Sequence, residues 1–169
     1  MPKHDAIVLL KTDHAAVKKL FESEKSLTRQ DGKKKEAIFA QIEAALKVHA
    51  AIEEEIFYPA VKSARSEHVK DEAREGYEEH KQIKSLLAQI AAITPADETY
   101  DIKIKVLRED VEHHVKDEET EMFPDAKKFL GEKRLAELGA EMEARKQQLE
   151  KHPASKPASG NQPAAHSAK

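Results

Sequence analysis

The sequence contains no cysteine and no tryptophan, and it has only five glycines in 169 residues. The missing cysteines exclude disulfides, thiolate metal sites and cysteine nucleophiles, and they fit a reducing compartment. No apolar run approaches the roughly 18 residues that a membrane span needs, and the amino-terminal residues lack the apolar core of a signal peptide. We therefore expect a cytoplasmic protein with no membrane partner.

The sequence also has no excess of positively charged residues. Lysine and arginine number 29 against 32 acidic residues, which gives a formal net charge of -3. A surface of this kind is not built to neutralise phosphates, so nucleic acid is not an expected partner.

The residues that are abundant are those of helices. Charged residues make up 36% and apolar residues 39%, in stretches rich in Ala, Glu, Lys and Leu. This composition predicts an all-α protein. The length suits one domain, which we place at residues 1–150. Residues 151–169 are mostly Pro, Ala and Ser, and we expect them to form a disordered tail because they offer almost no apolar surface to bury.

Apolar residues recur at steps of three and four along most of the chain, which is the period of a helix packed on a core. Asp5 is the expected N-cap of the first helix, and Pro59 is expected to kink or end the second, leaving an extension to about residue 64. Short turns between long helices favour an up-down antiparallel four-helix bundle with an additional C-terminal helix. The predicted helices cover residues 5–27, 33–58, 67–93 and about 98–124, and the additional helix begins at 131.

Two stretches of the sequence repeat each other at their polar positions. They read HAAIEEEIFYP from residue 49 and HVKDEETEMFP from residue 114, each with a Glu four residues after the His and a Pro ten residues after it. A four-residue step brings two side chains to the same face of a helix, so His49 and Glu53 point the same way, as do His114 and Glu118. This is a metal-ligand spacing.

A lone histidine precedes each of these pairs in the apolar stripe of the preceding helix. His14 lies 35 residues before His49, and His80 lies 34 residues before His114. The chain is thus two helical hairpins of one design, and four antiparallel helices would bring the six residues into one layer. No Lys or Arg stands at a neighbouring inward position to neutralise the two Glu, so we predict that metal cations do so.

Two simpler interpretations remain open. A His on an apolar face is usually a hydrogen-bonded core residue, so a metal-free helical interaction module is an alternative. The spacing alone is also weak evidence, because His68 and Glu72 repeat it in a mostly polar or small surrounding with no Phe-Pro after them. We interpret that third pair as idle.

His and carboxylate ligands without thiolate suit iron, manganese or zinc, and paired carboxylates in a bundle core are typical of di-iron sites. The order His, HxxxE, His, HxxxE, with FYP and FP after the acidic pairs and a trailing GEKRLAELGAEMEARK helix, resembles the hemerythrin-like HHE cation-binding domains over about residues 5–150. The resemblance implies two non-haem Fe ions, bridged by carboxylates and by an oxo or hydroxo group, that bind oxygen, peroxide or nitric oxide for sensing, storage or oxidative-stress defence. It implies terminal ligands at His14, His49, His80 and His114 and bridging ligands at Glu53 and Glu118.

The chain departs from the family's oxygen carriers at two places. Lys84 stands where they have a fifth His, and the repeat favours Glu118 over Glu119 as the last acidic ligand. Two six-coordinate irons would then keep two open positions where the carriers keep one, although Glu121 also lies on the His114 face and would be able to fill one. The two open positions favour a catalase-like or peroxidase enzyme as the alternative to a binding protein. We expect the protein to be a monomer or a weak homo-oligomer.

We expect the residues next to the predicted ligands to be structural or solvent-exposed rather than to bind metal. Tyr58 and Phe123 align in the repeat, and we expect them to pack beside the prolines rather than touch metal. Asp13 and Glu79 each precede a lone His and are candidates to accept hydrogen bonds from the ligand histidines, but adjacent helix positions diverge by about 100°, so we expect both to be solvated.

Overall fold

The computed structural model describes residues 5–152, and in this part of the chain all regular structure is helical, without a strand. The predicted all-α class is therefore confirmed. The predicted tail lies, from residue 153 on, outside the described residues. The helices are α1 (Ala6–Lys25), α2 (Gly32–Ile52), α3 (Tyr58–Lys62), α4 (Glu67–Ala91), α5 (Tyr100–Asp117) and α6 (Phe123–Lys151). Three short segments join them: a 3-10 turn, η1 (Arg29–Asp31), and two π-helical turns, η2 (Glu53–Phe57) and η3 (Glu118–Met122).

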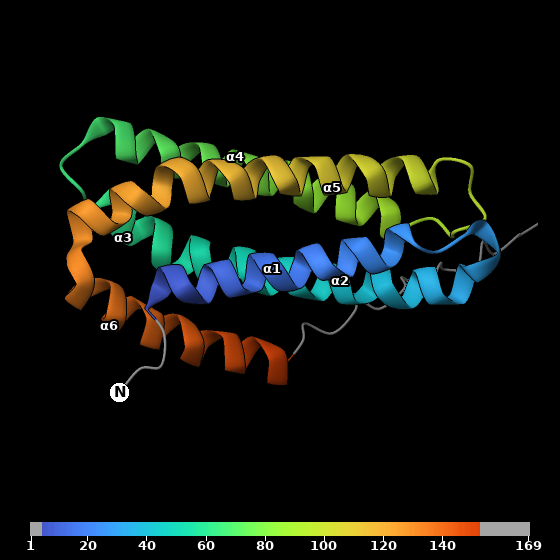
Figure 1. Ribbon diagram of the computed structural model, residues 1–169, viewed down its shortest axis with the longest axis horizontal. Helices are drawn as coiled ribbons and strands as arrows, with labels where there is room; N and C mark the ends of the chain where they lie inside the picture. Colours follow the sequence, from blue (N-terminus) through green and yellow to red (C-terminus); the bar gives the residue numbers. More distant parts are fainter. Residues whose placement is uncertain (1–4, 153–169) are drawn as a thin grey trace, which may run out of the picture.

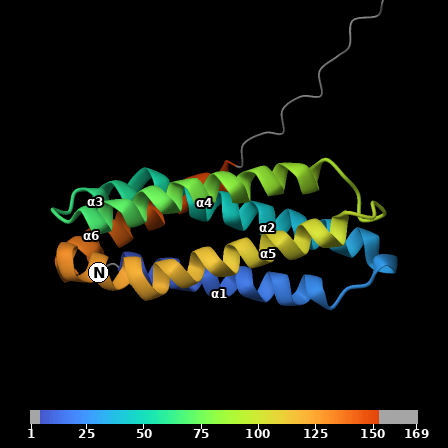
Figure 2. The same ribbon diagram turned by 90° about the horizontal axis from the view of Figure 1, so that it is seen from above.

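Four long helices form the body of the molecule (Figure 1). Helices α1 and α2 make one hairpin, α4 and α5 make the other, and successive helices run in opposite directions. Figures 1 and 2 together show α5 beside α1 and α4 beside α2, so the two hairpins stack as a square bundle. None of the described helices is long and apolar enough to cross a membrane.

The first helix begins as the sequence predicts. Asp5 has an extended backbone, and its side chain accepts a hydrogen bond from the backbone N–H of Val8 at 2.9 Å. This N-cap fixes the start of α1 and hence the register of its buried stripe, in which His14 lies between Leu10 and Val17.

Both helices that carry a His-Glu pair pass into a π-helical turn at the Glu. The backbone N–H of Tyr58 donates to the carbonyl of Glu53, five residues back, and Phe123 does the same to Glu118. The wider turn lets the chain continue past Pro59, so this proline does not end the helix, which extends to Lys62.

A π turn would pair the carbonyl of Glu54 with residue 59, but a proline there has no N–H. The hydroxyl of Tyr77 on α4 donates to this carbonyl instead, at 3.0 Å. The π turn is thus stabilised by a side chain from the neighbouring hairpin.

The additional C-terminal helix is joined to the fourth helix of the bundle. α6 begins at Phe123 and bends sharply at Gly131, whose φ of 75° favours glycine, and its second part returns along α1 and α2 (Figure 1). Leu138 and Met142 on this part are fully buried. Arg145 donates two hydrogen bonds to Glu55, at 2.6 and 3.0 Å, and ties the segment to η2.

The apolar core is divided into two clusters. One contains Leu10, Ile52 and Tyr58 and includes α3 and the buried face of α6, and the other contains Val17 and Ile83 near the opposite end. The clusters separate at the level of the four histidines, where polar side chains replace apolar ones inside the bundle. The fold therefore surrounds one polar layer with apolar packing on both sides.

Candidate metal centre

All six residues predicted as metal ligands face the interior of the bundle at one level. None is more than 6% exposed. Their donor atoms form two groups that share Glu53, each with all atoms within 4.8 Å of one another. The groups are His14, His49, Glu53 and Glu118, and Glu53, His80 and His114.

The two glutamates lie between the histidine pairs. One oxygen of Glu53 is 3.2 Å from Nε2 of His49, and its other oxygen is 3.1 Å from Nε2 of His80. Oε2 of Glu118 is 3.2 Å from Nε2 of His14 and 3.6 Å from Nε2 of His114. Each carboxylate therefore reaches one histidine of each hairpin, as a bridging ligand would.

The histidines meet in pairs through their inner nitrogens. Nε2 of His14 and His49 are 3.2 Å apart, and Nε2 of His80 and His114 are 3.1 Å apart. Two nitrogens bound to one ion at about 2.1 Å and roughly 90–110° from each other would be about 3.0–3.4 Å apart. Each pair thus has the spacing of two ligands of one metal ion.

Each outer nitrogen faces a carboxylate supplied by a different helix. Nδ1 of His14 lies 2.9 Å from Glu119, and Nδ1 of His80 lies 2.9 Å from Glu54. Glu119 and Glu54 directly follow the two buried glutamates in the sequence. Glu119 therefore serves as a histidine partner, whereas Glu118 occupies the interior.

The remaining two carboxylates correct the sequence-based prediction. Nδ1 of His114 lies 2.6 Å from Glu79, and Nδ1 of His49 lies 3.5 Å from Asp13. The expectation that both acids are solvated was wrong, because a residue turned 100° away from its neighbouring histidine points at the histidine of the paired helix.

These contacts determine which imidazole nitrogen can bind metal. A carboxylate beside Nδ1 favours a proton on that nitrogen, so Nε2 is the atom that would bind an ion once it carries no proton. The four Nε2 atoms converge in two close pairs. Within residues 5–152, Oε1 of Glu53 and Oε2 of Glu118 are buried without a hydrogen-bond partner. The donor set therefore fits metal cations, which would satisfy all of these atoms.

The electrostatics of the layer also favour positive charge. Burial disfavours the charged imidazole, but the Glu53 and Asp13 carboxylates outweigh it and raise the pKa of His49 to about 10. Burial is likewise outweighed at His114, where Glu118 and Glu53 raise the pKa well above its ordinary value. In the opposite direction, His49 and His114 overcome the effect of burial and hold the pKa of Glu53 well below its usual range.

Tyr58 is a site residue that sequence reasoning missed. Its hydroxyl donates to Glu118 at 2.8 Å and lies 3.3 Å from Nε2 of His80. Tyr58 is packed as expected, with its ring on His80 and Tyr77, but the hydrogen bond of its hydroxyl was not foreseen. Phe123, its counterpart in the repeat, packs with its ring stacked on that of His14 at 5.8 Å. The two halves of the site therefore differ by one hydroxyl.

A glycine inside α4 makes room for this tyrosine. A Cβ atom at Gly76 would lie 2.7 Å from the Tyr58 hydroxyl oxygen and 2.8 Å from the ring carbon that carries it. Glycine is unfavourable in the middle of a helix, so its presence there was the signal that a neighbouring group approaches closely.

Lys84 points away from the metal layer. Its ammonium group donates to both oxygens of Glu54, at 2.7 and 2.9 Å, and Glu54 in turn faces Nδ1 of His80. The residue that replaces the fifth histidine thus stabilises a carboxylate that orients one of the remaining four. Glu121 is exposed and is not part of either donor group of the layer.

A small pocket reaches the layer between α2 and α4. It has a volume of about 10 Å³ and is lined by His49, His80 and His114 together with apolar residues that include Ile83 and Leu87. This is about the space of one water molecule.

The comparisons with known proteins agree with this geometry. The family model described as the hemerythrin HHE cation binding domain matches residues 5–126. A protein named DNA nickase from Nostoc sp. (strain PCC 7120) is 32% identical over 143 residues, which cover 84% of this chain and 39% of that protein, so the chain spans about two fifths of its relative's length. The crystal structure of a hemerythrin HHE cation binding domain-containing protein from Mycobacterium kansasii has the same fold, with a TM-score of 0.77 and 23% identity over 90% of this chain and 94% of the other. The chain belongs to the hemerythrin HHE cation-binding domain family.

Proposed function

We propose that this protein holds two non-haem iron ions and binds oxygen, peroxide or nitric oxide at them, for sensing, storage or oxidative-stress defence. The observation that carries the proposal is the convergence of four histidine Nε2 atoms and two unpaired carboxylate oxygens in one buried layer. Imidazole and carboxylate donors without thiolate suit iron, manganese or zinc, and paired carboxylates in a bundle core favour di-iron among these.

The residues divide between two ion positions. His14 and His49 would hold one ion, and His80 and His114 the other, with Glu53 shared between them as its two oxygens are directed to opposite pairs. Iron bound there would supply redox chemistry toward oxygen and its reduced forms. The protein's own contribution is to orient the imidazoles and exclude bulk water.

The size and lining of the pocket beside the layer support a small ligand. Its volume of about 10 Å³ and its apolar wall favour molecules of two or three non-hydrogen atoms over larger organic substrates. Charged or bulky substrates would have to displace packed side chains such as Ile83 and Leu87.

A catalase-like activity is the second candidate, and the Tyr58 hydroxyl is the observation that favours it. This buried phenol already donates to Glu118, and burial followed by the charge of Glu53 raises its pKa well above the ordinary value. It therefore keeps its proton at neutral pH beside one histidine pair, where decomposition of peroxide would need proton transfer.

The activity named for the Nostoc relative is not part of this proposal. That protein is more than twice as long as the segment matched by this chain. A net charge of -3 does not favour attraction to a DNA backbone either, so the absence of a nucleic-acid partner stays a prediction.

Metal analysis and optical spectra of the purified protein, before and after peroxide is added, test the proposal. We expect about two irons per chain and visible charge-transfer bands that change with peroxide. His49→Ala should lose iron, whereas His152→Ala should not, because His152 is exposed and lies outside the donor groups of residues 5–152. A protein that takes up no iron, or the same amount in both variants, would refute the proposal and leave the metal-free interaction module.

Oxygen release from peroxide distinguishes the two candidates. If the protein is an enzyme, iron-loaded protein releases oxygen over many turnovers and Glu53→Ala abolishes this release. A binding protein changes its spectrum once and releases none.

A further inference from the structure

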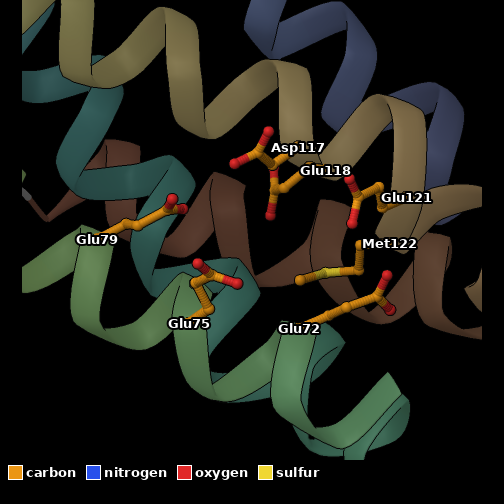
Figure 3. Close-up of a pocket in the computed structure, with 8 residues that line it drawn as sticks. Glu72, Glu75, Glu79, Asp117, Glu118, Glu121 and Met122 are labelled. Carbon is orange, nitrogen blue, oxygen red and sulfur yellow. The ribbon is translucent and has the colours of Figure 1, made fainter. Parts of the chain in front are cut away.

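A second pocket reaches the metal layer through a different face of the bundle from the apolar one. It lies between α4 and the end of α5 with η3, has a volume of about 40 Å³, and six of the eight described residues that line it are acidic. Figure 3 shows the carboxylates of the two helices facing each other across it. The lining consists of Glu72, Glu75, Gly76, Glu79, Asp117, Glu118, Glu121 and Met122.

Glu72 is the residue that makes this more than a solvated acidic surface. It is 9% exposed, and neither of its carboxylate oxygens has a hydrogen-bond partner among residues 5–152. Its side chain points across the pocket toward Glu121 and Met122 (Figure 3). A buried carboxylate without a partner is costly, so this position calls for a cation.

A metal-ligand donor set surrounds that carboxylate. His68, Glu72 and Glu121 place one donor atom each within 4.8 Å of the others. Nε2 of His68 is 3.6 Å from Glu72 and 4.0 Å from Asp125, which is too far for a hydrogen bond but suits ligands around a common ion. These are the same types of ligand, at the same four-residue spacing, as in the buried centre.

The pocket connects this donor set with the buried centre. Glu118, which lines the pocket, is a predicted bridging ligand, and Glu79, which also lines it, holds Nδ1 of His114. The space between would hold roughly three water molecules at ~10–15 Å³ each. A hydrated cation could therefore pass from the surface to Glu118 along carboxylates, without crossing the apolar core.

We propose that His68, Glu72 and Glu121 form a separate divalent-cation site at the mouth of this pocket, which captures ferrous iron from solvent and passes it to the buried centre. The His68–Glu72 pair that the sequence led us to interpret as idle is then the outer ligand pair. The capture step concerns these three residues alone, while the delivery step rests on the proposed di-iron function.

Calorimetric titration of Mn²⁺ into the iron-loaded protein tests capture. We expect one additional weak site, with affinity reduced at least about 10-fold in Glu72→Gln and in His68→Ala. Glu78→Gln is the matched control, because it removes the same charge from an exposed position of the same helix, and it should leave the affinity unchanged. Equal Mn²⁺ affinity in Glu72→Gln, Glu78→Gln and the parent protein would overturn the proposal, whether or not the buried centre holds iron.

The rate of anaerobic iron uptake, followed in a stopped-flow spectrometer, tests delivery. Glu72→Gln should slow uptake by about 10-fold at low ionic strength while the final iron content stays at the parent value. Unchanged uptake would refute delivery through this pocket. Loss of the final iron content in His49→Ala concerns the buried centre only, so the two proposals can fail separately.

Discussion

Replacing Gly76 by alanine should disturb the metal layer through Tyr58. The new methyl carbon would lie 2.7 Å from the tyrosine oxygen and 2.8 Å from the ring carbon beside it. Carbon atoms in contact prefer about 3.5–4.0 Å, so one of the groups must move by roughly 1 Å. Tyr58 has no free space for this, since it is fully buried, with its ring stacked on His80 and packed edge-on against Tyr77.

The expected loss follows from two opposing effects. Overpacking a rigid core costs about 1–3 kcal/mol, and replacing glycine by alanine within a helix returns about 0.5–1 kcal/mol. The net destabilisation should be about 1–2 kcal/mol, or about 2–8 °C in Tm for a domain of this size. A shift of the phenol should also lengthen its 2.8 Å hydrogen bond to Glu118.

Thermal unfolding of the metal-free protein measures this effect. Gly32→Ala is the control, because the nearest atom to a Cβ there is Pro95 Cβ at 4.0 Å, and we expect no loss of stability. In the double variant Gly76→Ala with Tyr58→Phe, part of the clash is removed, so the losses should fall short of additivity by at least about 0.5 kcal/mol. A Gly76→Ala protein as stable as Gly32→Ala, or additive losses in the double variant, would refute the reasoning.

Further predictions concern the charges of the layer. The folded-state pKa of His49, about 10, lies above its ordinary value of 6.5. The protonated His49 therefore stabilises the metal-free protein fully below pH 6.5, and this stabilisation is lost as pH rises toward 10. The Tm of the metal-free protein should fall over that range, and a flat profile would contradict this. The lowered pKa of Glu53 acts in the opposite direction, giving stability above its ordinary value of 4.5 that is lost as pH falls through the lowered folded-state pKa. The raised pKa values of His49 and His114 keep both side chains protonated in the metal-free protein at pH 7.5. Binding of ferrous iron at this pH should therefore release about two protons, which calorimetry in buffers of different ionisation enthalpy would detect. Release of no protons would show that these pKa values are not raised. Glu79→Gln weakens the partner of His114 Nδ1 and should reduce metal affinity about 10- to 100-fold relative to Glu78→Gln, so equal affinity in the two variants would exclude this role.

Much of the helical layout was accessible from the sequence because it depends on local patterns. The Asp5 cap and the three-and-four spacing of apolar residues predicted α1 and α4 closely. The same spacing placed His14 and His80 on inward faces, and both are buried. These features are set by residues within one or two turns of each other.

The contacts that sequence reasoning missed are those between helices. The π turn at Glu53 changes the direction of Tyr58 by a fraction of a turn, and helix periodicity alone does not reveal such a change. Asp13 and Glu79 were assigned to solvent because only their own helices were considered, whereas their partners lie on the neighbouring helix. A helical wheel describes one helix and omits what faces it.

The most direct test of the central claim is X-ray diffraction from crystals of the iron-loaded protein at the iron absorption edge. The account predicts two anomalous peaks per chain in the buried layer, one beside Nε2 of His14 and His49 and one beside Nε2 of His80 and His114, with Glu53 between them. A fully ordered layer without anomalous density, in protein saturated with ferrous iron, would contradict it.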